Sequence, residues 1–313
     1  MGHDVTNLLE LAPADVPAEL RADYYFDFDA HPFEHAELFR GKNARSVIDT
    51  IAGIGEYAAA QVDRIITNVK DADTWDQERF EGRSCGRFTV VLEEGAVFEP
   101  AYVVGGAEQA GVLHLGPGAK VLGANIWLNE GNISIGAGSM VEPGAGLKGP
   151  TLVGRDNEIR QGSYFRGNVI LGNGCTVRGE IKNAVLMDRC DYPHPSYLGD
   201  SLCGYRSHFG NQATSANLKV FDIVERKNIA IELDGRTYDL GRRKVGIVMG
   251  DCSQVGCNSV SDPGVFLAPW VIVYQLTRLK KGFYGPDRVM KNKPLEHDVI
   301  EFAPLRRDKD KPV

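Results

Sequence analysis

His194 lies in a segment that can hold a side chain in a fixed place. Pro193 and Pro195 flank it, and each proline ring fixes its own backbone and restricts the residue before it. Histidine is the side chain whose charge changes near neutral pH. The sequence therefore marks His194 as a candidate functional residue, with a purely structural loop histidine as the alternative.

Three side chains near His194 in the sequence suit a phosphorylated ligand. Lys182 precedes the histidine, Tyr197 follows it, and Arg166 comes directly after the apolar Phe165. Arginine and lysine bind phosphate oxygens, and tyrosine adds a hydrogen bond. We expect these three side chains to form, together with His194, a locally basic pocket outside the core that binds a phosphorylated ligand.

A second basic cluster comprises Arg242, Arg243 and Lys244. Such a cluster suits a phosphorylated ligand, which an acidic protein can bind only where cations are locally gathered. The alternative is a solvated turn, in which the three charges only face water.

Composition excludes several classes of function. The chain has 313 residues, with 35 Lys and Arg against 42 Asp and Glu, and a net charge of −7. Such a chain has no global electrostatic reason to bind nucleic acid or an anionic membrane. No apolar run approaches the ~18 residues of a membrane span, and the start lacks the basic region of a signal peptide. We expect a cytoplasmic protein without nucleic-acid or membrane partners.

A metal site is not expected. The six cysteines show neither a CxxC pair nor the spacing of a zinc site, and His31 and His35 are the only histidines at a ligand-like spacing. This pair lies in the aromatic-rich segment FDFDAHPFEHAELF, where packing is the simpler interpretation.

The residues that would position this chemistry follow a period of six. Large apolar side chains recur at this spacing through the middle of the chain: Ile135, Val141, Leu147, Val153, Ile159, Phe165, Leu171 and Val177. A period of six matches neither a helix nor a simple strand. It predicts an all-β fold, a single-stranded left-handed parallel β-helix of hexapeptide repeats, in which each hexad is a short strand plus a tight turn.

The period extends to about residues 91–282 and predicts the β-helix over that range. Two interruptions are expected as insertions, at 183–197, where the prolines lie, and at 218–247. The second contains a predicted β-hairpin from Ile229 to Leu240 that turns at Asp234 and Gly235.

The two ends of the chain lack the hexad. Residues 1–90 are predicted to form an α-helical extension, because apolar side chains fall at helical spacing over about 44–70. We expect this helix to cap or flank the prism. Residues 283–313 are interpreted as a C-terminal tail.

The motifs SYFRGN, EIKNA, PHPSYLGDS, TSANLK and GRRKVG occur in this order. Together they resemble the left-handed β-helix acetyltransferase part of the bacterial bifunctional enzyme that makes UDP-N-acetylglucosamine, and of archaeal sugar-1-phosphate nucleotidyltransferase relatives. The close resemblance covers 158–217 and 241–279. The nucleotidyltransferase half of that family is absent from residues 1–90, which contain no glycine-rich nucleotide loop.

The resemblance implies roles for individual residues. His194 corresponds to the general base, and Asn217 contacts the amino group of the sugar. The sugar phosphate is bound by the remaining matched residues: Arg166, Lys182, Tyr197 and Lys244.

The resemblance also implies acetyl-CoA as co-substrate, with no metal required. We assign the coenzyme to Asn211, Arg242, Arg243, Cys257 and Gln275. A backbone N–H within 210–213 is the expected donor to the oxyanion. Gly210, Asn211, Gln212 and Ala213 replace a run of small residues in the family, and His208 replaces an asparagine.

The predicted function is acetyl transfer from acetyl-CoA to an amino sugar phosphate resembling glucosamine-1-phosphate, in nucleotide-sugar metabolism. The predicted assembly is a homotrimer, with a separate nucleotidyltransferase as a further partner. The alternative is a catalytically silent β-helix that binds sugar phosphates or regulates that nucleotidyltransferase. The bulky Asn211 and Gln212 favour this alternative.

Overall fold

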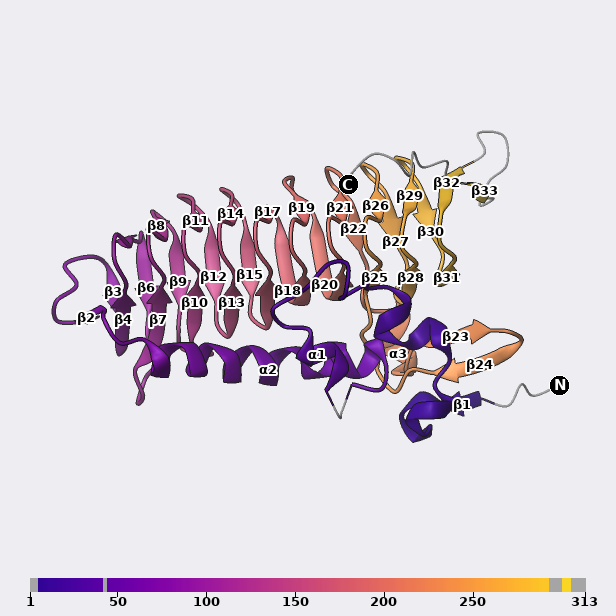
Figure 1. Ribbon diagram of the computed structural model, residues 1–313, viewed down its shortest axis with the longest axis horizontal. Coiled ribbons are helices and arrows are strands. Elements are labelled where there is room, and N and C mark those ends of the chain that lie inside the picture. Colours follow the sequence, from indigo (N-terminus) through magenta and orange to yellow (C-terminus); the bar gives the residue numbers. More distant parts are fainter. Residues whose placement is uncertain (1–4, 42–43, 293–299, 305–313) are drawn as a thin grey trace.

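Each hexad forms one strand and one corner of a triangular coil. The computed structural model describes residues 5–41, 44–292 and 300–304, and most of them form a prism of stacked coils (Figure 1). Strands of successive coils pair in parallel, and Ile133 pairs with Thr151, which in turn pairs with Val169. This register advances the chain by three hexads for each coil. The predicted left-handed parallel β-helix is confirmed.

The prism has three faces. The first face comprises β4 (Phe88–Leu92), β7 (Gly111–Leu115), β10 (Ile133–Ile135), β13 (Thr151–Val153), β16 (Val169–Leu171), the ends of β18 (Glu180–Leu186) and β20 (Tyr197–Cys203), β25 (Ile247–Met249), β28 (Val265–Leu267) and β31 (Gly282–Tyr284). The second face comprises β3 (Ser84–Cys85), β6 (Tyr102–Val104), β9 (Asn125–Trp127), β12 (Gly146–Lys148), β15 (Tyr164–Arg166), the beginnings of β18 and β20, β22 (Thr214–Ser215), β27 (Val260–Ser261) and β30 (Arg278–Leu279). The third face comprises β5 (Val97–Glu99), β8 (Lys120–Leu122), β11 (Met140–Val141), β14 (Glu158–Ile159), β17 (Thr176–Val177), β19 (Asp191–Tyr192), β21 (His208–Phe209), β26 (Gln254–Val255), β29 (Val271–Val273) and β32 (Arg288–Asn292).

The hexad side chains fill the inside of the prism. Leu147, Phe165 and Val177 are fully buried there, with the other apolar members of the repeat. Because the interior is packed with side chains, any chemistry must lie on the outer surface or at the corners.

The N-terminal extension covers the first face. Helix α2 (Val47–Asn68) runs along the prism across the coils (Figure 1). Ser46 and Asp49 form a capping box at its start. The predicted α-helical extension is confirmed, and this helix lies within the predicted 44–70.

The outward side chains of the first face are apolar, which explains why α2 packs there. Leu152, Ile170, Val185 and Leu202 are buried in one cluster with the apolar side of α2. Two of these strands contain uninterrupted apolar triplets, VIL at 169–171 and AVL at 184–186, the pattern of a strand that is buried on both sides.

Shorter elements complete the extension. They are β1 (Val5–Asn7), four 3₁₀ turns (Leu8–Glu10, Pro13–Asp15, Ala18–Leu20 and Ala22–Tyr24), α1 (Glu37–Arg40) and β2 (Asp73–Asp76). β2 pairs antiparallel with β4, and β1 pairs in parallel with the inserted hairpin.

Residues 183–197 are not an insertion. They contain the end of β18, all of β19 and the turn before β20, and they form one coil of the stack. The hexad fails here because the coil is shortened: Thr176 pairs with Asp191, and Asp191 pairs with His208, and both of these spacings fall short of three hexads. A shortened coil shifts the phase of the repeat in the same way that an insertion does.

Most of residues 218–247 leave the prism, and the chain re-enters it at β25 (Ile247–Met249). They contain α3 (Asp222–Glu225) and the antiparallel hairpin of β23 (Ala230–Leu233) and β24 (Arg236–Asp239), which extends away from the coils (Figure 1). Asp234 and Gly235, both with positive φ, form the turn. The predicted inserted hairpin is confirmed.

The strand stack is longer than the predicted 91–282. It begins at β3, before residue 91, and reaches β31 and β32 in the segment interpreted as a tail. β33 (Ile300–Pro304) pairs antiparallel with β32. The rest of the predicted tail, 293–299 and 305–313, lies outside the described residues. No helix in the described ranges is long and apolar enough to cross a membrane.

Candidate functional site

Three cations lie on successive strands of the second face. Lys148 of β12 pairs with Arg166 of β15, and Lys182 follows at the next strand, β18. These three side chains line one hollow of about 280 Å³ at the corner between the second and first faces. The structure therefore places Arg166 and Lys182 together, as the sequence predicts, and adds Lys148.

Two of these cations have acidic partners. Lys148 Nζ lies 3.1 Å from Glu130 Oε1, and Arg166 lies 2.6 Å from Glu180 Oε1. These hydrogen bonds raise the pKa of Lys148 and of Arg166. Lys182 forms no ion pair within the described part of the chain, so its charge is available to a ligand.

A hydrogen-bond network centred on Asp200 lies next along the same face. Asn217 Nδ2 donates to Asp200 Oδ2 at 2.6 Å, and Asn183 Nδ2 donates to Asp200 Oδ1 at 2.9 Å. Asp200 is 6% exposed, so its carboxylate needs these donors. The arrangement fixes the amide of Asn217, the predicted contact of the sugar's amino group.

Tyr197 belongs to the same region. Gly199 has no side chain, and a Cβ there would lie 2.5 Å from Tyr197 Oη and 2.9 Å from Asn217 Nδ2. The phenol and the amide therefore meet in the space above this glycine. Burial raises the pKa of Tyr197, with further contributions from Asp200 and Glu180, so the phenol stays protonated and can donate a hydrogen bond.

His194 lies apart from this network. It is exposed in the turn between β19 and β20, and no hydrogen bond in the described residues holds its ring. The turn itself is tied to the next coil, because Gln212 N donates to the oxygen of Pro195 at 2.8 Å. The backbone position of His194 is thus fixed, and its side chain is free to meet a ligand.

Three of the predicted coenzyme residues stack at one corner. Asn211, Cys257 and Gln275 occupy successive coils where the third face turns into the second. Backbone bonds connect these coils, from Asn258 N to the oxygen of Asn211 (2.9 Å) and from Leu276 N to the oxygen of Cys257 (3.0 Å). Because Gln212 bonds to Pro195, the same corner continues to the His194 turn.

The other predicted coenzyme residues lie elsewhere. Arg242, Arg243 and Lys244 end the inserted segment, where Lys244 bridges to Leu218 just after Asn217. Arg242 lies 3.6 Å from Asp200, and Arg243 pairs with the buried carboxylate of Asp222. The structure therefore separates the predicted coenzyme residues into two groups at opposite ends of the second-face strands, and acidic partners already hold two of the three cations.

Sequence reasoning missed Asp200, the centre of the network. Asn168, Asn183 and Asp200 occupy the same corner on three coils, with left-handed φ values of 56°, 48° and 49°. Asparagine and aspartate are the residues other than glycine that adopt this conformation most readily. The recurrence of short polar residues at one corner of successive coils is the sequence signal that could have identified Asp200.

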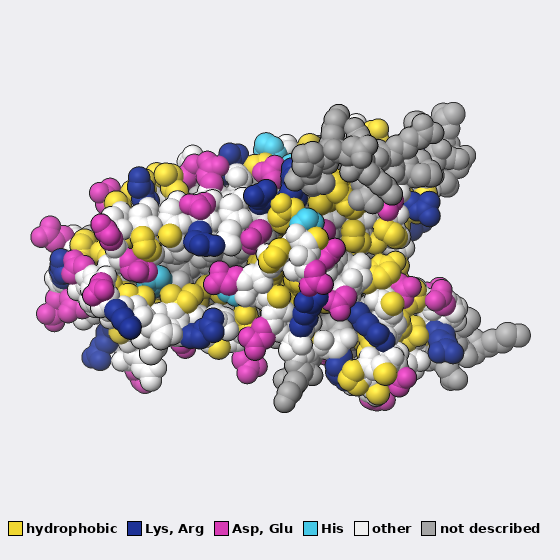
Figure 2. Space-filling model, viewed as in Figure 1, with side chains coloured by type: hydrophobic (Ala, Val, Ile, Leu, Met, Phe, Trp, Pro, Cys, Tyr) yellow, Lys and Arg dark blue, Asp and Glu magenta, His cyan; other side chains and the backbone are white. Residues whose placement is uncertain are grey.

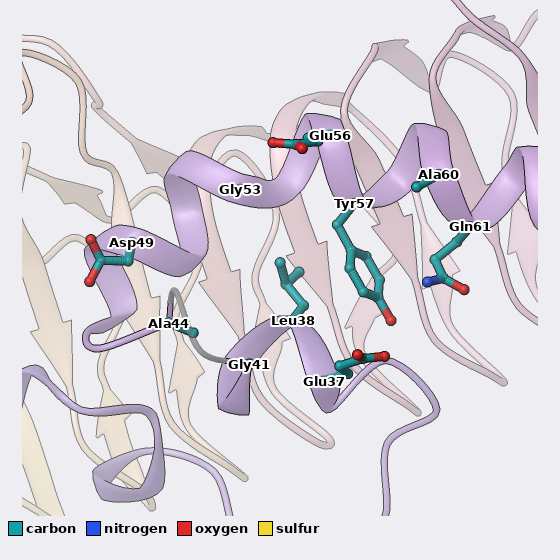
Figure 3. Close-up of a pocket in the computed structure, with 10 residues that line it drawn as sticks. All are labelled: Glu37, Leu38, Gly41, Ala44, Asp49, Gly53, Glu56, Tyr57, Ala60 and Gln61. Carbon is teal, nitrogen blue, oxygen red and sulfur yellow. The ribbon is translucent and has the colours of Figure 1, made fainter. Parts of the chain in front are cut away.

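A second hollow, of about 340 Å³, lies between α1 and α2 (Figure 3). Its polar side chains are those of Glu37, Asp49, Glu56, Tyr57 and Gln61. Asp49 already caps α2 and pairs with Arg45. No residue that the sequence predicts as functional lines this hollow.

The paired histidines serve packing. His31 stacks on Tyr205 with ring centroids 4.0 Å apart, and His35 is buried with its Nδ1 3.3 Å from the hydroxyl of Tyr57. In the described ranges, no group of three or more His, Cys, Asp and Glu side chains is arranged to hold a metal ion.

Parts of this chain are similar to known proteins. No protein-family model matches the chain. A bifunctional sugar-1-phosphate nucleotidylyltransferase/acetyltransferase of Sulfurisphaera tokodaii is 31% identical over 182 residues, which are 52% of this chain and 44% of that protein. The bifunctional protein GlmU of Methanococcus maripaludis is 30% identical over 137 residues, which are 43% of this chain and 32% of the relative. The resemblance stated from the motifs is confirmed.

The chain spans less than half the length of these two relatives. Among solved structures, the polySia specific acetyltransferase NeuO is similar over 75% of this chain and 93% of its own, at 11% identity and a TM-score of 0.30. The polysialic acid O-acetyltransferase OatWY is similar over 72% of this chain and 87% of its own, at 13% identity and a TM-score of 0.25. At these scores neither structure bears on the activity of the chain.

Proposed function

We propose that the chain transfers an acetyl group from acetyl-CoA to the amino group of a sugar phosphate. The observation that carries this proposal is the second face, where the hollow of Arg166 and Lys182 adjoins the network of Tyr197 and Asn217. Such a surface offers cations to a phosphate and directed hydrogen bonds to a sugar. The name of the Sulfurisphaera tokodaii relative supports it, since that protein is a bifunctional sugar-1-phosphate nucleotidylyltransferase/acetyltransferase.

The acceptor would lie across neighbouring strands. Lys182 and Arg166 bind its phosphate, and the Arg166 guanidinium can exchange Glu180 for phosphate because that ion pair is partly exposed (39% and 38%). Tyr197 and Asn217 contact the sugar, with Asn217 held by Asp200. Lys244, beside Leu218, supplies a further cation at the far end of the site.

The reaction needs a base and an oxyanion donor. The amine nitrogen bonds to the thioester carbon, His194 takes the amine proton, and the carbon–sulfur bond breaks. The proton then passes from His194 to the departing thiolate, so no acyl-enzyme and no metal take part.

One backbone group in the expected segment suits the oxyanion. The N–H groups of Gly210, Gln212 and Ala213 already donate to Val255, Pro195 and Gly210. No bond among the described residues uses the N–H of Asn211. We therefore assign the oxyanion donor to Asn211 N–H, on the coil next to the His194 turn.

The coenzyme would follow the corner of Asn211, Cys257 and Gln275. This strip leads away from His194 along the prism, so a thioester at its start would face the base. Arg242, Arg243 and Lys244 lie at the other end of the strands and would contact only a distant coenzyme phosphate. Cys203 is buried, and burial raises the pKa of its thiol, so it suits packing and not nucleophilic attack.

The deciding experiment is release of free thiol. The purified chain is incubated with acetyl-CoA and glucosamine-1-phosphate, and thiol is measured over time, with acetyl-CoA alone as the control for hydrolysis. Acceptor-dependent release supports the transferase. Release that is equal with and without acceptor contradicts it.

A silent β-helix is the second candidate. The lack of a hydrogen bond to the His194 ring among the described residues and the pairing of Arg243 with Asp222 both favour it. Isothermal titration separates the two candidates. Sugar-phosphate binding without any coenzyme A binding would support the silent form, which would then act through a separate nucleotidyltransferase.

The assembly is proposed to be a homotrimer, since corners such as the His194 turn are exposed along the prism. Light scattering should give three times the 34.2 kDa of one chain. A monomer at micromolar concentration would contradict the trimer.

A further inference from the structure

Two aromatic side chains, Trp127 and Tyr164, continue the second face beyond the proposed site, and we call this pair the aromatic plate. Trp127 of β9 and Tyr164 of β15 lie on either side of β12, with ring centroids 6.4 Å apart and planes at 68°. Gly146 of β12 lies beneath them, and a Cβ there would be 3.1 Å from the Trp127 ring and 3.3 Å from the Tyr164 ring. The glycine thus lets the two rings meet over the strand, and both remain partly exposed.

Lys148 connects this plate to the phosphate hollow. Its Nζ lies 5.9 Å from the centroid of the Trp127 ring, and the same side chain lines the hollow with Arg166 and Lys182. The plate, Lys148, Arg166 and Lys182 therefore form one continuous strip on β9, β12, β15 and β18. Nothing in acetyl transfer to a monosaccharide phosphate uses the plate or Lys148.

The length of this strip exceeds one sugar phosphate. Neighbouring strands lie ~4.8 Å apart, so four steps from Tyr197 on β20 to Trp127 on β9 span about 19 Å. A hexosamine with one phosphate is shorter than that distance. Three cations followed by partly exposed aromatic rings match a chain of two phosphates that ends in a flat heterocycle.

We propose that the acceptor is a nucleotide-activated amino sugar. This inference rests on the proposed acetyl transfer and names its substrate class. The sugar lies by Tyr197 and Asn217, the two phosphates lie on Lys182, Arg166 and Lys148, and the base stacks on the plate. The side chain of Glu130 is 52% exposed, and exposed ion pairs are weak, so Lys148 can exchange Glu130 for a phosphate with little loss of free energy.

The test compares two probes, UDP-glucosamine and glucosamine-1-phosphate, by isothermal titration of the full chain. UDP-glucosamine should bind about tenfold more tightly or better at the same ionic strength. Lys148→Gln should weaken UDP-glucosamine by about fivefold or more and glucosamine-1-phosphate by a clearly smaller factor, because Lys148 lines the hollow beside the single phosphate. Trp127→Leu should show the same selectivity, because it removes the stacking surface and leaves all three cations in the chain.

Lys120→Gln is the matched control, since Lys120 is an exposed lysine at an outward position of the third face. It should change neither affinity. Circular dichroism of each variant establishes that the β-helix has formed. Glutamine is chosen at Lys148 because it keeps most of the aliphatic stem of lysine, so that packing is disturbed little.

Equal affinities for the two probes, or equal losses of both probes in Lys148→Gln, would overturn the inference. The proposed function fails in a different way, by releasing no thiol with either acceptor. Transfer to glucosamine-1-phosphate with no preference for UDP-glucosamine would keep the transferase and remove only the nucleotide-activated acceptor.

Discussion

The first and second faces of the prism share one set of coils, and their outward residues differ. On the first face these residues are apolar, as at Ile170 and Leu202, and α2 covers them. On the second face they include Lys148, Arg166 and Lys182, and the surface stays open. The backbone repeat is indifferent to this choice, so outward side chains alone decide which face packs and which face binds.

Charge distribution agrees with this contrast. Acidic and basic side chains are interspersed over the visible surface, without one large field of a single sign (Figure 2). A chain of net charge −7 therefore attracts an anionic ligand only where cations are locally gathered. The hollow of the second face is such a place.

The largest effect should come from the proposed base. His194→Ala should lower turnover by about 10²- to 10⁴-fold with little change in sugar-phosphate affinity, because only the proton acceptor is lost. Arg166→Ala should mainly raise KM. Steady-state kinetics measures both, and His208→Ala on the third face is the control. Full activity in His194→Ala would assign the base to another residue.

The contrast between faces predicts opposite consequences for two truncations. Leu202→Ala should lower the free energy of unfolding by about 2–5 kcal/mol, because it leaves a cavity under α2. Lys182→Ala should change it by less than about 0.5 kcal/mol and instead weaken sugar-phosphate binding. Urea denaturation with parallel titration checks this pair. Comparable losses of stability in both variants would contradict the division of roles.

Two glycines of α2 sharpen the description of the covered face. A Cβ at Gly55 would lie 2.8 Å from the Asn168 side chain, whereas one at Gly53 would make an ordinary 3.6 Å contact with Leu38. Gly55→Val should therefore destabilise the fold by about 1–3 kcal/mol through overpacking. Gly53→Ala should stabilise it by about 0.5–1 kcal/mol. Thermal unfolding that ranks the two variants in the reverse order would show that α2 does not approach the prism closely at Gly55.

The smallest effect concerns the paired cations. Charge reversal of Arg243 together with Lys244 should weaken coenzyme A binding about tenfold, and less at high salt. Lys244→Ala alone should account for most of that loss, because Asp222 already holds Arg243. Titration at two salt concentrations measures it. A larger loss from Arg243→Ala would mean that the pair with Asp222 opens when the coenzyme binds.

Much of the architecture was readable from local pattern. The hexad of Ile135 to Val177 predicts the prism because each apolar side chain must point inward once per strand. The Asp234 and Gly235 turn predicts the hairpin, since both residues accept positive φ. The apolar triplets of the first face also indicate where α2 must pack, because a strand with apolar side chains on both sides needs another element to cover its outer side. The phase shift at 183–197 misled the prediction because a shortened coil breaks the period as an insertion does.

The sequence by itself therefore determined the repeat, the helix and the residue types available for chemistry. Only the tertiary structure decided which of them meet. Asp200 binds Asn217 across one coil, and Arg243 is held by Asp222 across the inserted hairpin. The register across that insertion joins His208 to Gln254, although the whole inserted segment separates them in the chain. Such contacts depend on the number of residues in each coil and on the number that leave the stack as an insertion. Both numbers are set by how whole coils pack on one another, and the local sequence pattern does not show them.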